Sequence, residues 1–99
     1  MTYRVVPAPE FSDALSDAAL WYLGQAGPEV ARRFVDAAQE TVVGLGDFPL
    51  LHAENAVVGA RRVGVPGFPY LIWYRVSATT VRVLALSHIR SRGPVLRAR

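Results

Sequence analysis

The spacing of apolar residues changes once along this 99-residue chain, close to Pro49. Before Pro49, apolar residues recur at intervals of three and four, which is the period of an amphipathic helix. After Pro49 they alternate with polar residues or form short valine-rich runs, as strands do. Helical segments followed by strands around one core predict an α+β fold. We expect residues 1–99 to form one small domain, because a chain of this length supports a single core.

Two helices are predicted before Pro49. The stripe of the first comprises Phe11, Leu15, Ala18 and Tyr22. The stripe of the second comprises Val30, Phe34, Ala37, Ala38, Thr41 and Leu45. Glycines in residues 24–27 separate the two, Pro28 opens the second, and Gly44 and Gly46 end it. The short connection predicts an antiparallel helical hairpin.

Four strands are predicted, at residues 3–6, 57–65, 70–76 and 81–87. The last three are joined by short turns and should form an antiparallel meander. The expected order is therefore β-α-α-β-β-β, an antiparallel sheet with the helical hairpin packed on one face. Ile72 and Val83 should lie on the face that the helices cover.

The other face of the predicted sheet combines apolar and basic side chains. Alternation along the last two strands assigns to it Leu71, Trp73, Arg75, Arg82, Leu84 and Leu86. Arg61 and Arg62 should point to opposite faces, so only one of them can join this set. An apolar strip edged by arginine is typical of a docking surface. The alternative is that the C-terminal tail or the loop 47–56 folds over the strip.

Charge is unevenly distributed along the chain. Residues 1–55 hold three arginines and all eight acids, a net charge of −5, whereas residues 56–99 hold eight arginines and no acid, a net charge of +8. The C-terminal half should therefore meet nucleic acid or an acidic protein. Biased base composition would explain the absence of lysine, but it would not explain the absence of acids after Glu54.

Several classes of function are excluded or disfavoured. The chain has no cysteine, so disulfides and thiol nucleophiles are excluded. Without lysine it cannot carry a phosphate-binding Gly-x-x-x-x-Gly-Lys loop. His52 beside Glu54 does not make a metal site. We expect no metal, no cofactor, no membrane segment and a cytoplasmic location, since the first residues lack the pattern of a signal peptide.

The last third of the chain carries a recognisable series of short motifs. They are Phe68-Pro69-Tyr70, Tyr74, the β-rich run into His88, Arg90, Arg92, Pro94 and Arg97. Together with Trp21-Tyr22 and Phe48-Pro49 upstream, this series resembles the RelE/ParE family of toxins from bacterial type II toxin–antitoxin modules. The resemblance is closer to the ParE, or plasmid-stabilisation, branch.

The resemblance implies a toxin that a cognate antitoxin neutralises. In the ParE branch it implies binding and inhibition of DNA gyrase, and the expected target-binding residues are His88, Arg90, Arg92 and Arg97. The expected antitoxin-binding residues are Leu71, Trp73, Arg75, Arg82, Leu84 and Leu86, with Leu20 and Leu23 on the first helix. We expect the tail from His88 to Arg97 to be needed for toxicity and largely dispensable for folding.

The RelE branch implies an alternative, a ribosome-dependent mRNA endoribonuclease. Its chemistry needs an acid and a base, and positive charge at the phosphate. Here His88, Arg82 and Arg90 are the candidates. The chain departs from the nuclease pattern, with Leu71 where such toxins carry arginine and no tyrosine after Tyr74. Trp21 and Tyr22 are expected to belong to the core.

Overall fold

The computed structural model describes residues 2–55 and 58–96. Its elements are β1 (Arg4–Pro7), α1 (Pro9–Ala26), α2 (Pro28–Gly44), β2 (Glu54–Asn55), β3 (Ala60–Gly64), β4 (Tyr70–Ser77) and β5 (Thr80–His88). The predicted α+β class and the order of the main elements are confirmed. The short strand β2 was not predicted, because two residues carry no alternation.

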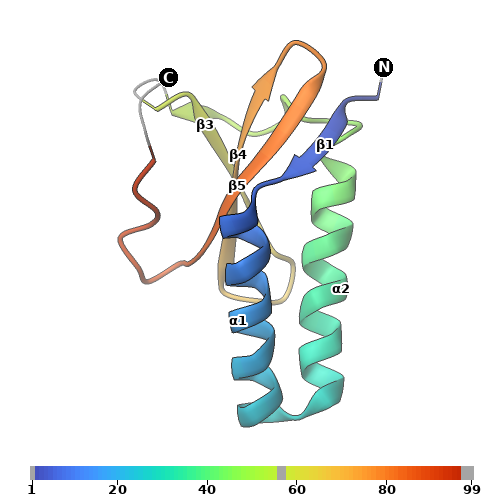
Figure 1. The fold of residues 1–99 in the computed structure, drawn as a ribbon, viewed down its shortest axis with the longest axis vertical. Helices are drawn as coiled ribbons and strands as arrows, with labels where there is room; N and C mark the ends of the chain where they lie inside the picture. Colours follow the sequence, from blue (N-terminus) through green and yellow to red (C-terminus); the bar gives the residue numbers. More distant parts are fainter. Residues whose placement is uncertain (1, 56–57, 97–99) are drawn as a thin grey trace.

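The two helices form the predicted hairpin (Figure 1). Pro9 and Pro28 occupy first-turn positions, where a missing N–H costs nothing. Glu10 and Glu29 place negative charge at the positive ends of the helix dipoles. Gly27 joins the helices with a φ of 93°, a conformation that glycine adopts without steric cost.

The sheet is mixed rather than antiparallel, which corrects the prediction. Its strand order is β1-β5-β4-β3-β2. β1 pairs parallel with β5, and every other pair is antiparallel. Tight turns fix the direction of neighbouring strands, but β1 and β5 lie at opposite ends of the chain. No local signal could therefore set their relative direction.

A β-bulge in β5 changes the faces of its last residues. Tyr74 pairs with Val83 and Trp73 pairs with Ala85, so Leu84 is an extra residue without a partner on β4. Beyond the bulge Leu86 pairs with the buried Ile72 and packs against the core. The prediction that Leu86 lies on the outer face is therefore wrong.

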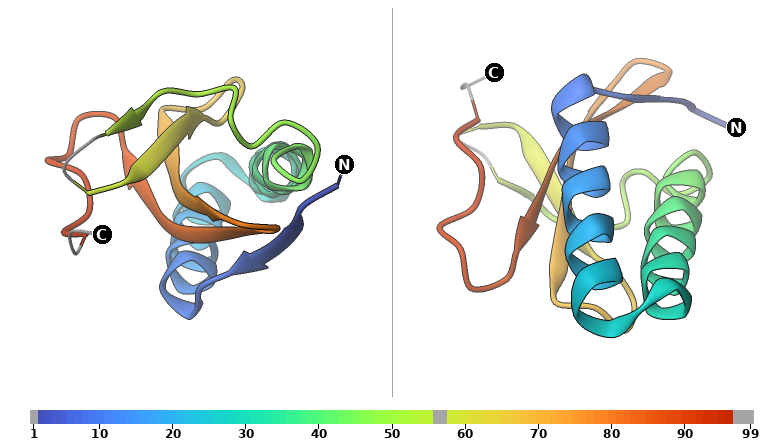
Figure 2. Two further views of the ribbon diagram at one scale, coloured as in Figure 1. Left: turned by 90° about the horizontal axis from the view of Figure 1, so that it is seen from above. Right: turned by 60° about the horizontal axis from the view of Figure 1, so that its bottom comes forward.

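The helices cover one face of the sheet, as predicted (Figure 2). Ile72, Tyr74, Val81 and Val83 of the sheet are fully buried, and so is Phe34 of α2. An aromatic cluster extends this core toward the helix connection. Its members are Tyr22, Phe34, Phe68 and Tyr70, with ring centroids 5.0 to 6.3 Å apart.

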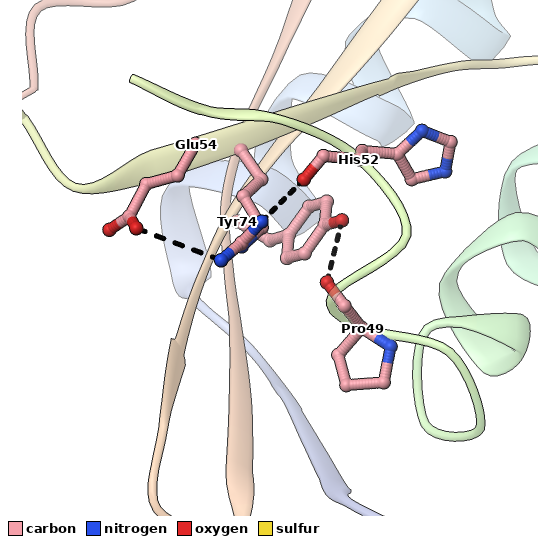
Figure 3. A network of polar contacts seen from close by, with 5 residues as sticks. Pro49, His52, Glu54 and Tyr74 are labelled. Carbon is pink, nitrogen blue, oxygen red and sulfur yellow. Dashed lines mark hydrogen bonds and ion pairs between the residues drawn. The ribbon is translucent and has the colours of Figure 1, made fainter. Parts of the chain in front are cut away.

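The segment between α2 and β3 is fastened to the sheet by polar contacts (Figure 3). The Tyr74 hydroxyl donates to the carbonyl of Pro49 at 3.0 Å. Arg61 donates to the carbonyl of His52 and lies 3.6 Å from the carboxylate of Glu54. These contacts hold the segment beside β3. Its residues Ala53, Glu54 and Asn55 line a pocket of about 280 Å³ together with Arg62 and Trp73, which lie on the sheet face opposite the helices.

Candidate functional site

The outer face of the sheet, opposite the helices, is centred on Trp73. Its indole N–H donates to the hydroxyl of Ser87 at 2.8 Å. The guanidinium of Arg62 lies 5.6 Å from the indole ring, within cation–π range. Leu71 lies on the same face, because it pairs with Ser87. Leu71, Trp73 and Leu84 are half-buried rather than exposed.

The C-terminal tail, residues 89–96, explains part of this burial. It leaves the end of β5 and runs on the outer side of the sheet (Figure 2). Gly93 lies beside Trp73, and a Cβ atom there would be 3.4 Å from Cζ2 of the indole. The alternative in which the tail folds over the apolar strip therefore holds at Trp73.

Arginines surround the strip. Arg75 and Arg82 are direct cross-strand partners, and Arg62 is the partner of Trp73. Arg61 instead pairs with Tyr74 on the core side, which confirms that Arg61 and Arg62 point to opposite faces. Arg75 donates from Nε to the carbonyl of Val58 at 3.0 Å, whereas Arg62 and Arg82 are exposed.

The tail begins with a local hydrogen-bonded turn. The backbone N–H of Arg90 donates to Nδ1 of His88 at 3.1 Å, and the N–H and hydroxyl of Ser91 both donate to the His88 carbonyl. The ring of His88 lies 5.3 Å from that of Tyr70 in an edge-to-face arrangement. Arg90 and Arg92 are exposed. Arg97 lies outside the described residues.

The three candidate nuclease residues do not form one site. His88 and Arg82 are separated by six positions along β5, about 20 Å at the rise of a strand. They also lie on opposite sides of the sheet, since His88 pairs with Tyr70 and Arg82 with Arg75. Arg90 lies beside His88, but the contact between them is made by the backbone N–H of Arg90 rather than by its guanidinium. One phosphate could not meet all three.

The C-terminal half of α1 carries a second apolar surface. Leu20, Trp21 and Leu23 are 64%, 58% and 46% exposed, respectively. The prediction for Tyr22 is confirmed, because it packs against the core, but Trp21 is not a core residue. The helical spacing indicates the exposure of Trp21, because this residue lies about 80° around the helix axis from Phe11 at 100° per residue.

Sequence reasoning missed two further features. A pocket of about 340 Å³ lies between α1 and the ends of the last strands, lined by Trp21, Tyr22, Pro69, Tyr70 and His88. Phe48, Leu50 and Leu51 are exposed in the segment after α2. Neither feature follows from periodicity, because each depends on how segments meet in space.

Burial affects two phenols. It raises the pKa of Tyr22, with a further contribution from the neighbouring Tyr70. Burial also raises the pKa of Tyr74, although the charge of Arg61 acts in the opposite direction. Both hydroxyls therefore stay protonated at neutral pH. In the part of the chain that the structure describes, no cluster of three metal-ligating side chains is found, and no helix is long and apolar enough to cross a membrane.

Comparison with known proteins places this arrangement in a class of small toxins. The chain matches a solved structure described as the chromosomal ParDE TA system from P. aeruginosa, with a TM-score of 0.78 and 20% sequence identity. The match covers 88% of this chain and 96% of that one, and it establishes the fold. A search of curated proteins returned no significant match.

The family itself follows from the sequence. The model of the ParE toxin of the type II toxin–antitoxin system parDE matches residues 5–92. The chain therefore belongs to the ParE toxin family.

Proposed function

We propose that this toxin acts by binding and inhibiting DNA gyrase, in the cytoplasm, and that it is not a nuclease. The support is the separation of His88 from Arg82, on opposite sides of the sheet and about 20 Å apart. RNA cleavage needs its acid, base and cations around a single phosphate. Binding to a protein surface makes no such demand.

The proposed target-binding residues are His88 at the end of β5, Arg90 and Arg92 at the start of the tail, and Arg97, which lies outside the described residues. Arg90 and Arg92 are exposed, and neither forms an ion pair within the described residues. Guanidinium groups presented in this way suit carboxylates on a partner protein. Because the tail makes mostly local hydrogen bonds, its arginines contribute little to the core.

The proposed antitoxin-binding surface has two parts. One is the outer face of the sheet, with Leu71, Trp73, Arg75, Arg82 and Leu84. The other is Leu20 and Leu23 on α1. An acidic amphipathic segment of the antitoxin would match both, since its apolar side chains meet leucine and tryptophan while its carboxylates meet arginine. Leu86 is excluded, because it packs against the core.

The deciding experiment compares two variants in growth arrest, supercoiling by purified gyrase and ribosome-dependent mRNA cleavage. We expect Arg90→Ala/Arg92→Ala to abolish toxicity and gyrase inhibition, and His88→Ala to change them only mildly. Arg32→Ala/Arg33→Ala on α2 is the matched control, and thermal melting checks that every variant is folded.

Two outcomes would contradict the proposal. If the folded tail double variant keeps full toxicity, the tail is not the target-binding surface. If His88→Ala alone loses activity by about 10²–10⁴, as expected for loss of a general acid or base, and the toxin cleaves mRNA, the protein is an endoribonuclease.

A further inference from the structure

Four arginines from four neighbouring strands lie in a line across the outer face. Arg82 of β5 and Arg75 of β4 are direct partners. Arg4 of β1 pairs with Thr80, two positions from Arg82, and Arg62 of β3 pairs with Trp73, two positions from Arg75. Because β4 and β5 are antiparallel, Arg4 is displaced along the strand axis in one direction from the Arg75–Arg82 pair, and Arg62 is displaced in the other direction. We call this set of four residues the arginine diagonal.

The length of the arginine diagonal follows from sheet geometry. Neighbouring strands are about 4.8 Å apart and each residue rises about 3.3 Å, so the Cα atoms of Arg4 and Arg62 are about 20 Å apart. Successive phosphates of one strand of duplex DNA rise about 3.4 Å along the axis. Because the strand winds around the axis, neighbouring phosphates are further apart than this rise, and a line of about 20 Å can meet several of them.

The strands β1, β3, β4 and β5 contain no acidic residue. Glu54 of β2 lies 3.6 Å from the guanidinium of Arg61, and it also lines a pocket beside Arg62 and Trp73. Like charges directly opposite each other on a sheet are destabilising, and Arg75 faces Arg82. Arg75 donates to the carbonyl of Val58, whereas Arg82 is exposed and accessible to an anionic ligand.

We propose that the arginine diagonal binds the phosphate backbone of duplex DNA without sequence preference. In the free toxin, the contact between the tail and the apolar side chains of the outer face favours DNA over an acidic peptide as the ligand. Gly93 of the tail lies against Trp73, whereas Arg4, Arg62 and Arg82 are exposed. A phosphate backbone needs only the exposed arginines, while an amphipathic peptide must first displace the tail.

The choice of duplex DNA rests on the proposed function, because gyrase acts on duplex DNA. The toxin would then bind the same duplex DNA that gyrase binds. An antitoxin that covers Arg75 and Arg82 would release the DNA at the same time as it neutralises the toxin. Binding should be non-specific, with a Kd of about 10⁻⁴–10⁻⁶ M at physiological salt.

The test is fluorescence anisotropy of a labelled 20-base-pair duplex (about 20 phosphates per strand) titrated with the purified toxin between 50 and 200 mM salt, about the range in which phosphate contacts lose affinity most steeply. We expect Arg82→Gln to weaken binding by about fivefold to tenfold and to reduce the salt slope by about one. Arg32→Gln, which removes the same charge from an exposed position on α2, should leave both unchanged. The melting temperature of Arg82→Gln should not fall, because the substitution relieves the repulsion with Arg75.

Two competitors complete the experiment. An acidic polyglutamate peptide that binds as tightly as the duplex would overturn the assignment in favour of a protein partner. Single-stranded RNA of the same length that binds more tightly would overturn it in favour of RNA. Equal loss in Arg82→Gln and Arg32→Gln would mean that net charge, not this face, is responsible. DNA binding without inhibition of gyrase would leave this proposal standing while the proposed function failed.

Discussion

At the scale of single residues, Tyr74 links the core to the segment after α2. Its ring is fully buried, and its hydroxyl reaches the carbonyl of Pro49. Beside it Arg61 binds His52 and Glu54. Two side chains of the sheet therefore hold a segment whose own Phe48, Leu50 and Leu51 face outward.

Tyr74 gives the fold a pH dependence with a definite sign. Because burial raises its pKa in the folded state, the folded protein keeps the phenolic proton that the unfolded chain loses near pH 10. The resulting stability is fully present below about pH 10 and is lost as the pH rises through the folded pKa. Urea denaturation at pH 8 and at pH 10.5 should show this decrease.

Tyr74→Phe is the matching variant. It should lower stability at pH 8 by about 1 kcal/mol, because the carbonyl of Pro49 loses its donor. It should also weaken the decrease above pH 10. An unchanged decrease in this variant would assign the pH dependence to another group, with Tyr22 as the next candidate.

At the scale of elements, the bulge in β5 marks where prediction from sequence ends. Alternation correctly assigned Val81 and Val83 to the core and Arg82 to the outer face. It failed after Leu84, because an inserted residue leaves no sign in a two-residue period. Helix positions were predictable from Pro28 and the glycines around it. The parallel pairing of β1 was not, since it depends on segments distant in the chain.

The bulge makes a prediction about two neighbouring leucines. Leu86→Ala should cost about 1–2 kcal/mol, because Leu86 packs against the core, whereas Leu84→Ala should cost less than about 1 kcal/mol. If the alternation of side chains along β5 continued without a bulge, both leucines would lie on the outer face, and both substitutions would have the same small effect on stability. Chemical denaturation of the two variants distinguishes these cases, and the reverse order of costs would contradict the register described above.

At the scale of the whole molecule, charge is divided between the layers. Six of the eight acids are on α1 and α2, whereas the arginines of the outer face and of the tail are on the opposite side. This division of charge also places the candidate site on the basic side of the molecule. The basic C-terminal half was visible in the sequence, but the arginine diagonal required the strand order to be known. The two proposed antitoxin surfaces also lie apart, on a helix and on the sheet.

An antitoxin that covers both surfaces must therefore wrap around the toxin. We expect Trp73→Ala to weaken antitoxin binding by at least about 2 kcal/mol, as for a buried interface anchor. Leu20→Ala should weaken it as well, and the two effects should add, since the sites share no contacts. Calorimetry with the antitoxin that co-purifies with the toxin measures the affinity of the two single variants and of the double variant Trp73→Ala/Leu20→Ala. No loss from Leu20→Ala would confine the antitoxin to the sheet.

The edges of the sheet restrict how any partner can attach. β1, at one edge, has four residues and ends in a proline, and its start lies against Gly46. β2, at the other edge, has only two residues. Short or proline-containing edge strands discourage the addition of a further strand. The toxin is thereby guarded against edge-to-edge aggregation while it is free of its antitoxin, and its partners are left to recognise side chains rather than backbone.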